Sequence, residues 1–175
     1  IDLTAADQQT VLRCVSIDGV DFAVSFASDG TEAAWVRSRA PDRRVILKVE
    51  REEAILNLDA LAQQADELWI CRGDLGAQLG LSNMARQLAC IDPRQHEIPM
   101  LMAGQVLEHL TQHDQPTRSE VCHLTDLIFR GYAGIVLSDE TAIGAAPASA
   151  TRWAAQLMRE ALAPLPRPLA RQNRA

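Results

Sequence analysis

Residues 44–76 read RVILKVEREEAILNLDALAQQADELWICRGDLG, and this stretch decides the fold class of the chain. Two short apolar runs, VILKV and LWIC, enclose a longer amphipathic stretch. Runs this short are typical of buried strands, whereas the stretch between them is typical of a helix. Two strands joined through a helix pair in parallel, because a parallel connection needs a crossover of this length. The segment therefore predicts one βαβ unit.

The same alternation extends along the chain and predicts an α/β fold with about five parallel strands and flanking helices. Three helices have recognisable ends: one capped by Thr4 and reaching Ile17, one capped by Ser119 and reaching Arg130, and one beginning near Pro147. The predicted strands are residues 20–25, 44–49, 67–71, 99–103 and 134–138.

Length and composition favour one globular domain, predicted over residues 1–163 and followed by a disordered Pro/Arg-rich tail at residues 164–175. The chain has 175 residues, 47% of them hydrophobic and 23% charged. Its net charge of −6 argues against binding to nucleic acid. The four cysteines form no C-x-x-C pair, and no apolar run approaches the roughly 20 residues of a membrane span. We expect a soluble, cytoplasmic protein with reduced thiols.

Five parallel strands leave an unfinished sheet, because a closed (β/α) barrel needs eight. Bare edges at both ends would invite pairing with another chain. Two solutions remain open at this point. The strands form an open doubly wound sheet with covered edges, or a second chain or segment completes them, which predicts a homo-oligomer or a complementing partner.

Charged side chains gather where the second and third predicted strands end. Lys48 and Glu50 are two residues apart, so they point to the same face of their strand. The third strand runs into Arg72, Gly73 and Asp74, where we expect a sharp turn whose free amides could bind an anion. In parallel sheets these ends meet at one edge, which is where ligands bind.

Two carboxylates placed side by side repel each other unless a cation lies between them. Hard oxygen ligands favour Mg²⁺ or Mn²⁺, so Glu50 and Asp74 predict a divalent-metal site with Lys48 beside it. The competing interpretation is a solvated Lys–Glu pair at the end of a strand, which is common and carries no function.

Four strings, in this order and at these separations, resemble the pyruvate kinase family: VILKVE (45–50), WICRGDLG (69–76), QPTRSE (115–120) and VLSDETAIG (136–144). The similarity extends from about Leu3 to about Met158. It implies the C-terminal half of that family's catalytic TIM-type barrel, and hence a partial (β/α) barrel. It also implies a phosphotransferase acting on phosphoenolpyruvate or pyruvate and on ADP or ATP, through an enolate stabilised by Mg²⁺ or Mn²⁺, with K⁺ as a further cofactor.

The resemblance assigns roles to individual positions. Lys48 looks like the family's catalytic lysine, and Glu50 and Asp74 look like its two metal-binding carboxylates. The segment Arg72, Gly73 and Asp74 is similar to the one that receives the substrate carboxylate, so the resemblance implies that these three residues bind substrate, Gly73 and Asp74 through their backbone. Three further residues, placed near the family's active-site mouth, are Ser138, Glu140 and Thr141.

The chain departs from the family at two positions near this site. Gly104 stands where the family has a threonine whose hydroxyl lies against the substrate, so the hydroxyl is missing. Asp139 stands where the family has glycine, and its charge is expected to weaken phosphate or nucleotide binding unless it points away.

Other parts of the family's enzyme have no counterpart in this sequence: the first three barrel strands, the lid domain and the C-terminal regulatory domain. Full kinase turnover is therefore expected to need another chain or segment. Two alternatives remain open: a catalytically impaired binding or assembly module, and a metal-dependent pyruvate lyase or aldolase that uses the same enolate chemistry without ATP.

Overall fold

A computed structural model describes residues 3–164 of the chain. Its centre is one parallel sheet of five strands in the order β1-β2-β3-β4-β5. The strands are β1 (Phe22–Val24), β2 (Val45–Val49), β3 (Glu67–Cys71), β4 (Met100–Ala103) and β5 (Gly134–Val136). All five predicted strands are confirmed, although every strand except β3 is shorter than predicted, the first and last by the most. The predicted tail lies outside the described residues, apart from Pro164.

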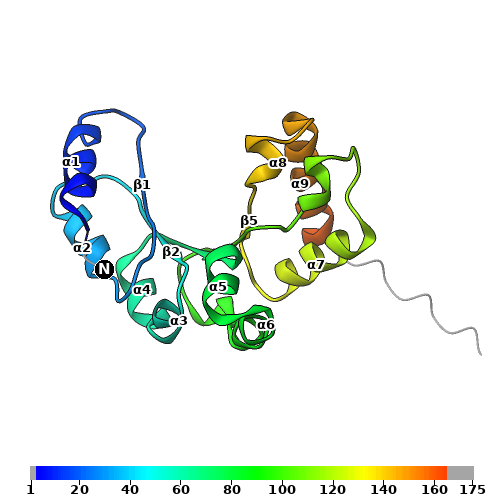
Figure 1. Ribbon diagram of the computed structural model, residues 1–175, viewed down its shortest axis with the longest axis horizontal. Coiled ribbons are helices and arrows are strands. Elements are labelled where there is room, and N and C mark those ends of the chain that lie inside the picture. The colour runs from blue at the N-terminus through cyan, green and yellow to red at the C-terminus, as the bar shows by residue number, and fades with distance from the viewer. Residues whose placement is uncertain (1–2, 165–175) are drawn as a thin grey trace, which may run out of the picture.

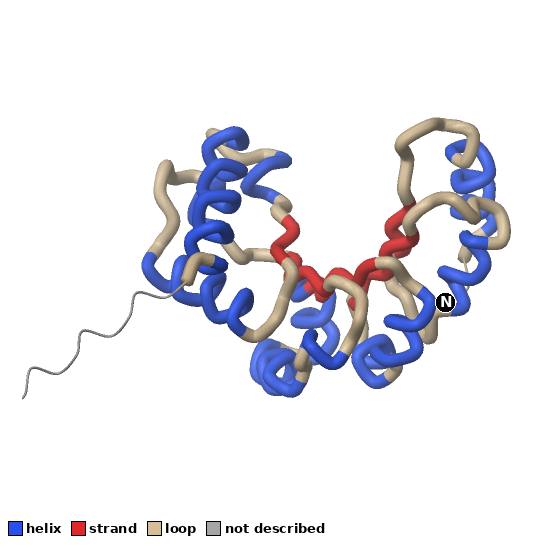
Figure 2. The backbone as a smooth tube through the Cα atoms, turned by 180° about the vertical axis from the view of Figure 1, so that it is seen from behind, coloured by secondary structure: helices blue, strands red, loops and turns tan. Residues whose placement is uncertain are grey.

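The sheet is curved, and the molecule has the shape of an arch (Figure 1). Strands line the inside of the arch and helices cover its outside (Figure 2). Spatial order follows sequence order, and the helices lie on one side only. A doubly wound sheet would reverse direction and carry helices on both faces. The fold is therefore a partial (β/α) barrel, and the doubly wound alternative is wrong.

The helices connect successive strands and bracket the sheet. The α-helices are α1 (Ala5–Cys14), α2 (Thr31–Arg37), α3 (Glu52–Leu56), α4 (Leu58–Gln64), α5 (Arg72–Leu79), α6 (Leu81–Cys90), α7 (Arg118–Phe129), α8 (Asp139–Ala142) and α9 (Pro147–Leu162). Two short 3₁₀ helices are η1 (Pro93–Gln95) and η2 (Glu108–Thr111). No helix among residues 3–164 is long and apolar enough to cross a membrane.

Two of the three predicted helix starts are confirmed, and one helix begins at a different cap residue. Thr4 caps α1 as predicted, in a capping box with Asp7, but the helix ends at Cys14 and not at Ile17. The cap of α7 is Thr117 and not Ser119, because Thr117 and Glu120 satisfy each other's backbone amides. Pro147 begins α9 as predicted.

The hydrophobic core lies between the sheet and the outer helices. From β2 and β3 it takes Val45, Leu47, Leu68 and Ile70, all fully buried. Side chains alternate along a strand, so the residues between these face the inside of the arch. One such row joins Lys48 to Trp69 and Leu101 by strand register. The outer strands β1 and β5 each have one neighbour within the described residues. Residues 3–164 thus leave one sheet face and two strand edges without cover.

Candidate active site

Lys48 and Glu50 form an ion pair at the carboxyl end of β2. The Lys48 Nζ lies 2.7 Å from Glu50 Oε1 and also donates to Ser25 Oγ at 3.2 Å. Glu50 is almost fully buried, with 3% of its side chain exposed, whereas Lys48 keeps 26%. Both side chains therefore point the same way, as their spacing predicts. A nearly buried carboxylate needs such a partner, because an unpaired charge is costly away from water.

The second oxygen of Glu50 fixes the loop that follows β1. Its Oε2 accepts the amide of Phe26 at 2.7 Å, and Arg51 donates to the Phe26 carbonyl. Phe26 has a φ of +54°, which is uncommon for a residue with a side chain. Strained backbone of this kind persists where surrounding contacts hold it in place, and it clusters at functional sites. The Phe26 loop is one wall of the site.

Asp74 lies in the first turn of α5, which begins directly after β3. Residues 72–74 are therefore helical, and the sharp turn predicted there is wrong. The start of α5 can still bind an anion, since the first amides of a helix have no hydrogen-bond partner within it. Cys71, the cap residue, makes no side-chain hydrogen bond to them. Asp74 and Glu50 line one open pocket of about 460 Å³, together with Phe26, Arg51, Ala77 and Gln78.

The charges of the site keep Lys48 protonated. Burial lowers the pKa of Lys48, but the hydrogen bond and charge of Glu50, helped by Cys71 and Asp74, outweigh it, so the net effect raises the pKa. Burial, followed by the Glu50 charge, raises the pKa of the Cys71 thiol to about 12. The site therefore holds an ammonium ion and a neutral thiol at physiological pH. A protonated amine stabilises developing negative charge but is a poor nucleophile.

Gly104 follows β4 and lies against the start of α5. A side chain at this position would place its Cβ 3.6 Å from the Gly73 amide nitrogen. The position that lacks the family's hydroxyl therefore faces the amides expected to bind an anion. Gly104 has a φ of +86° and Gln105 one of +52°, so the chain turns here through two left-handed residues. The Gly104 carbonyl accepts hydrogen bonds from both Nε (2.8 Å) and the second terminal nitrogen of Arg72.

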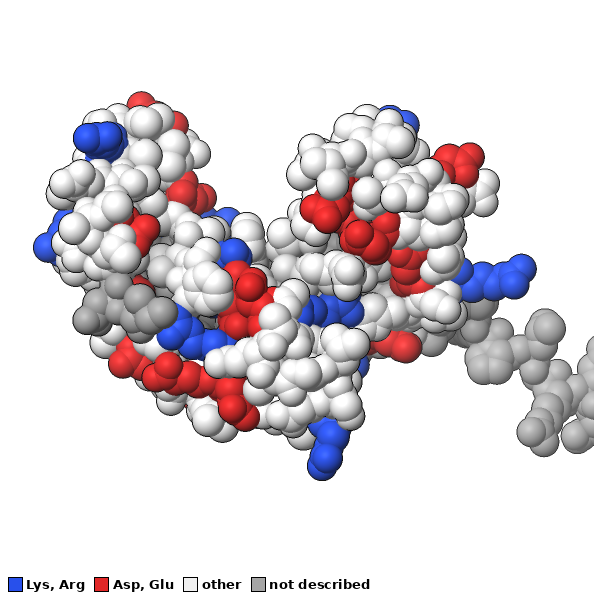
Figure 3. Space-filling model, in the orientation of Figure 1, with Lys and Arg blue, Asp and Glu red and all other residues white. Residues whose placement is uncertain are grey.

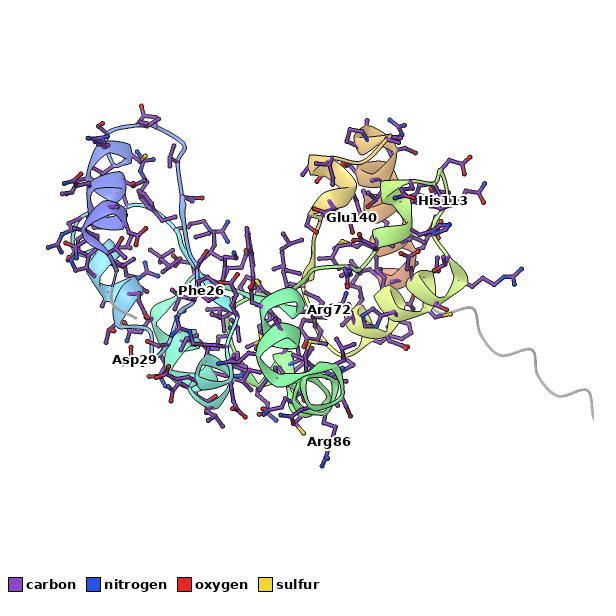
Figure 4. The ribbon with its side chains drawn as sticks, in the orientation of Figure 1. Phe26, Asp29, Arg72, Arg86, His113 and Glu140 are labelled. Carbon is purple, nitrogen blue, oxygen red and sulfur yellow. The ribbon has the colours of Figure 1, made fainter. Side chains whose placement is uncertain are left out.

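Residues 138–141 lie on the far arm of the arch, around α8 (Figure 4). Glu140 is 1% exposed, and its carboxylate accepts the amides of Ser138 at 2.8 Å and Leu107 at 3.3 Å. Thr141 donates its hydroxyl to the Ser138 carbonyl at 3.2 Å. Glu140 thus ties two loops together, whereas Asp139 is exposed. The predicted role of this segment at the site mouth stays a prediction.

The residues present fit a divalent cation held in part by a ligand. Glu50 and Asp74 supply hard oxygens to one pocket, and each Glu50 oxygen retains a lone pair beyond its contact with Lys48 or Phe26. Among residues 3–164, no group of three or more His, Cys, Asp or Glu side chains is placed to hold a metal. Two carboxylates completed by waters and substrate oxygens match the usual environment of Mg²⁺. A closed structural site would need more ligands from the chain.

Comparison with known proteins agrees with this geometry. The family model for the pyruvate kinase barrel domain matches residues 2–151, most of the chain. The chain belongs to the pyruvate kinase family. This membership explains why the charged residues gather at the carboxyl ends of β2 and β3, which is where barrel enzymes place their active sites.

Curated relatives support the same conclusion over a limited region. The chain is 30% identical to pyruvate kinase of Mycobacterium tuberculosis over 157 residues, covering 81% of the chain and 33% of the relative. It is 32% identical to pyruvate kinase of Thermoplasma acidophilum, covering 77% of the chain and 26% of the relative. It is 33% identical to the chloroplastic pyruvate kinase isozyme A of Ricinus communis, covering 76% of the chain and 24% of the relative. The chain therefore spans a third or less of these pyruvate kinases.

Several residues of the site were not found by reasoning from the sequence. Ser25 ends the first predicted strand, and its polar side chain at a strand end was a usable signal. Phe26 contributes backbone groups, which no side-chain pattern reveals. His123 of α7 contacts Arg72 at the start of α5 across 51 residues of sequence, a pairing that no local pattern reveals.

Replacement of Gly104 by alanine should destabilise the fold by about 1–3 kcal/mol, because a non-glycine residue is strained at positive φ. The space itself is open to a methyl group, since the nearest atom is 3.6 Å away. Gly73→Ala is the matched control: Gly73 lies in helix α5, has no positive φ, and has no neighbouring atom within 4 Å of the place where a Cβ would lie. It should stabilise by up to about 1 kcal/mol. Urea unfolding of both variants measures the difference, and a neutral Gly104→Ala would contradict the argument.

Proposed function

We propose that the chain binds pyruvate or phosphoenolpyruvate together with Mg²⁺ or Mn²⁺ and supports phosphoryl transfer through the enolate. The observation that carries this proposal is the Lys48–Glu50 pair, 2.7 Å apart, whose Glu50 lines one pocket with Asp74 in a pyruvate kinase barrel domain. Three charges kept this close, one of them nearly buried, are stabilised best by a ligand that bridges them.

Each group has a role that follows from its position. Lys48 stays protonated and would stabilise the negative oxygen of the enolate. The first amides of α5, at Gly73 and Asp74, would receive the substrate carboxylate. Glu50 and Asp74 would hold the cation, which would supply charge neutralisation for the enolate and the phosphoryl group. Arg72 was expected to bind substrate directly, but its guanidinium is engaged by Gly104 and His123. We therefore propose that Arg72 does not contact the substrate but holds the backbone of the anion site in place.

One observation favours a second candidate, a catalytically impaired module that binds ligand or partner. Gly104 places no side chain against the Gly73 amide, where the family's threonine hydroxyl is expected to act. Binding needs the charges of the site, whereas proton delivery to the enolate needs that hydroxyl. A chain with the charges and without the hydroxyl could bind the substrate and lack turnover. A lyase or aldolase would use the same site without ATP.

Proton NMR of pyruvate separates these candidates. In D₂O with Mg²⁺, the protein should speed the loss of the pyruvate methyl signal relative to a protein-free sample of the same composition. A signal that broadens with Mg²⁺ but is not lost indicates a binding module. Methyl exchange that never leads to phosphoryl transfer, with ATP present, indicates a lyase or aldolase. Pyruvate that neither exchanges nor broadens in a metal-dependent way contradicts the proposal.

We also propose that another polypeptide covers the open side of the arch in the working assembly. The support is physical: β1 and β5 each lack a second neighbour in the described part of the chain, and unpaired strand edges readily bind other strands. The hollow between the two arms is visible in the space-filling view, where acidic and basic side chains mix at its base (Figure 3). A homo-oligomer or a complementing chain would satisfy this requirement. Gel filtration with light scattering tests it, and a stable monomer as the active species contradicts it.

The nucleotide and K⁺ parts of the expected activity rest on family membership alone. ADP or ATP would be the phosphoryl partner, and Asp139 is exposed near the expected mouth, where it can point away from an anion. The NMR assay run with K⁺ and again with Na⁺ in its place tests whether K⁺ contributes to the activity of this chain.

A further inference from the structure

Arg72 is held by two groups, neither of which is a carboxylate. Its Nε and one terminal nitrogen donate to the Gly104 carbonyl, and its other terminal nitrogen lies 2.8 Å from His123 Nε2. Arg72 belongs to no ion pair between described residues. The cluster joins the start of α5, the end of β4 and the middle of α7. Figure 4 shows Arg72 at the base of the arch, between its two arms.

The chemistry of this contact fixes the state of the imidazole. A guanidinium carries only donors and stays protonated in proteins. At 2.8 Å, therefore, Arg72 donates and His123 Nε2 accepts. The imidazole must be neutral, with its proton on Nδ1. A protonated His123 has no acceptor to offer and would place a second cation against the first.

The surrounding charges act in the same direction. Burial, followed by the charge of Arg72, lowers the pKa of His123 below its ordinary value of 6.5, and Arg130 adds to this. Asp126, on the same helix, opposes it. Burial lowers the pKa of Arg72, and the charges of Tyr132 and Glu140, which raise it, do not outweigh burial. His123 is thus held neutral at pH 7.

We propose that His123 is a positioning residue whose neutral imidazole locks Arg72 onto the Gly104 carbonyl and so fixes the start of α5, where Gly73 and Asp74 lie. The lock matters because the Gly104 carbonyl and the Gly73 amide belong to neighbouring segments that Arg72 bridges. A Cβ at Gly104 would lie 3.6 Å from the Gly73 nitrogen and 3.7 Å from the Arg72 nitrogen. Movement of Arg72 therefore moves the first turn of α5 relative to β4.

Protonation of His123 breaks the lock, which makes the anion site sensitive to acid. Because the pKa of His123 in the folded protein lies below 6.5, the stabilisation from the Arg72–His123 contact is complete above pH 6.5 and is lost as pH falls through that lowered pKa. This inference rests on the proposed function for its effect on ligand binding. The lock itself is a property of the free protein and can be measured without ligand.

The first experiment is NMR on the ligand-free chain. Long-range ¹H–¹⁵N spectra should show His123 protonated at Nδ1 and not at Nε2, with a titration midpoint below 6.5. Protection of the Arg72 Nε proton against solvent exchange, measured relative to a free guanidinium at the same pH, should fall as His123 becomes protonated. In His123→Ala this exchange should already be about tenfold faster at pH 7.5, the factor expected for one hydrogen bond to a charged group. An Nε2-protonated imidazole, a midpoint at or above 6.5, or an Arg72 signal indifferent to the titration overturns the inference.

A conservative variant separates positioning from general destabilisation. In His123→Gln the side-chain oxygen can accept from Arg72 but cannot titrate between pH 5 and 8. It should restore slow Arg72 exchange and remove the acid-dependent step. Between pH 7.5 and 5.5, the Mg²⁺-dependent affinity for pyruvate should fall in the wild type. In His123→Gln it should stay constant over the same pH range. If Arg72 protection against exchange in the ligand-free wild type does not change as His123 is protonated, the lock is refuted. If it does change but pyruvate binds at no pH, only the proposed function is refuted.

Discussion

Lys48→Met should destabilise the protein by about 2–4 kcal/mol and remove metal-dependent methyl exchange of pyruvate. The reason is the position of Glu50, whose side chain is 3% exposed and would lose its only ion-pair partner among the described residues. Breaking a buried pair by removing one member leaves an uncompensated charge, which costs more than the pair contributed. Methionine keeps the volume of the aliphatic chain, so the effect reports the charge. Urea unfolding at pH 7 gives the stability, and the NMR assay gives the exchange.

Arg44→Met provides the matched control. Arg44 directly precedes β2 and also pairs with a carboxylate, that of Glu67, at 2.8 Å, but 54% of its side chain is exposed. An exposed pair contributes about 0.2–1 kcal/mol, so this variant should lose little stability. Equal losses for both variants, or a Lys48→Met protein that still exchanges the methyl protons, would refute the role given to the pair.

Glu50→Gln should reverse the direction of the Lys48 pKa. In the wild type burial lowers this pKa, and Glu50 raises it by more than burial lowers it. The amide keeps an acceptor for the Phe26 amide but has no charge, so burial would dominate and the pKa should fall below its ordinary value of 10.5. Lys48 is the single lysine among 175 residues, so one side-chain NMR signal reports it. Mg²⁺ binding should weaken in the same variant.

Glu53→Gln is the comparison for this experiment. Glu53 lies three residues along the chain, is 58% exposed, and faces Arg51 at 3.8 Å. It makes no contribution to the pKa of Lys48, which should stay above 10.5. In the wild type the ion pair therefore stabilises the fold below pH 10.5, and this stabilisation is lost as pH rises through the raised pKa. A Lys48 signal that titrates at the same pH in the wild type and in Glu50→Gln would show that the pair does not form.

The residues that carry charge could be predicted from the sequence because their information is local. The two-residue spacing of Lys48 and Glu50 on a strand determines that both point one way, and the ion pair confirms it. Hydrophobic runs determined five parallel strands, since a buried strand has few other patterns. Capping was less certain, and Thr117 took the place of Ser119 because the capping box with Glu120 satisfies two amides at once.

Tertiary structure alone decided how distant segments meet. The amphipathic patterns could not choose between a doubly wound sheet and a barrel segment, because both are built from the same alternation of short apolar strands and amphipathic helices. The two differ in the spatial order of the strands and in the side on which the helices lie. The state of Arg72 also came from packing: α7 brings His123 to it from 51 residues away, and β4 brings the Gly104 carbonyl. Sequence patterns report which face of an element is buried, whereas contacts between elements depend on how those faces pack together.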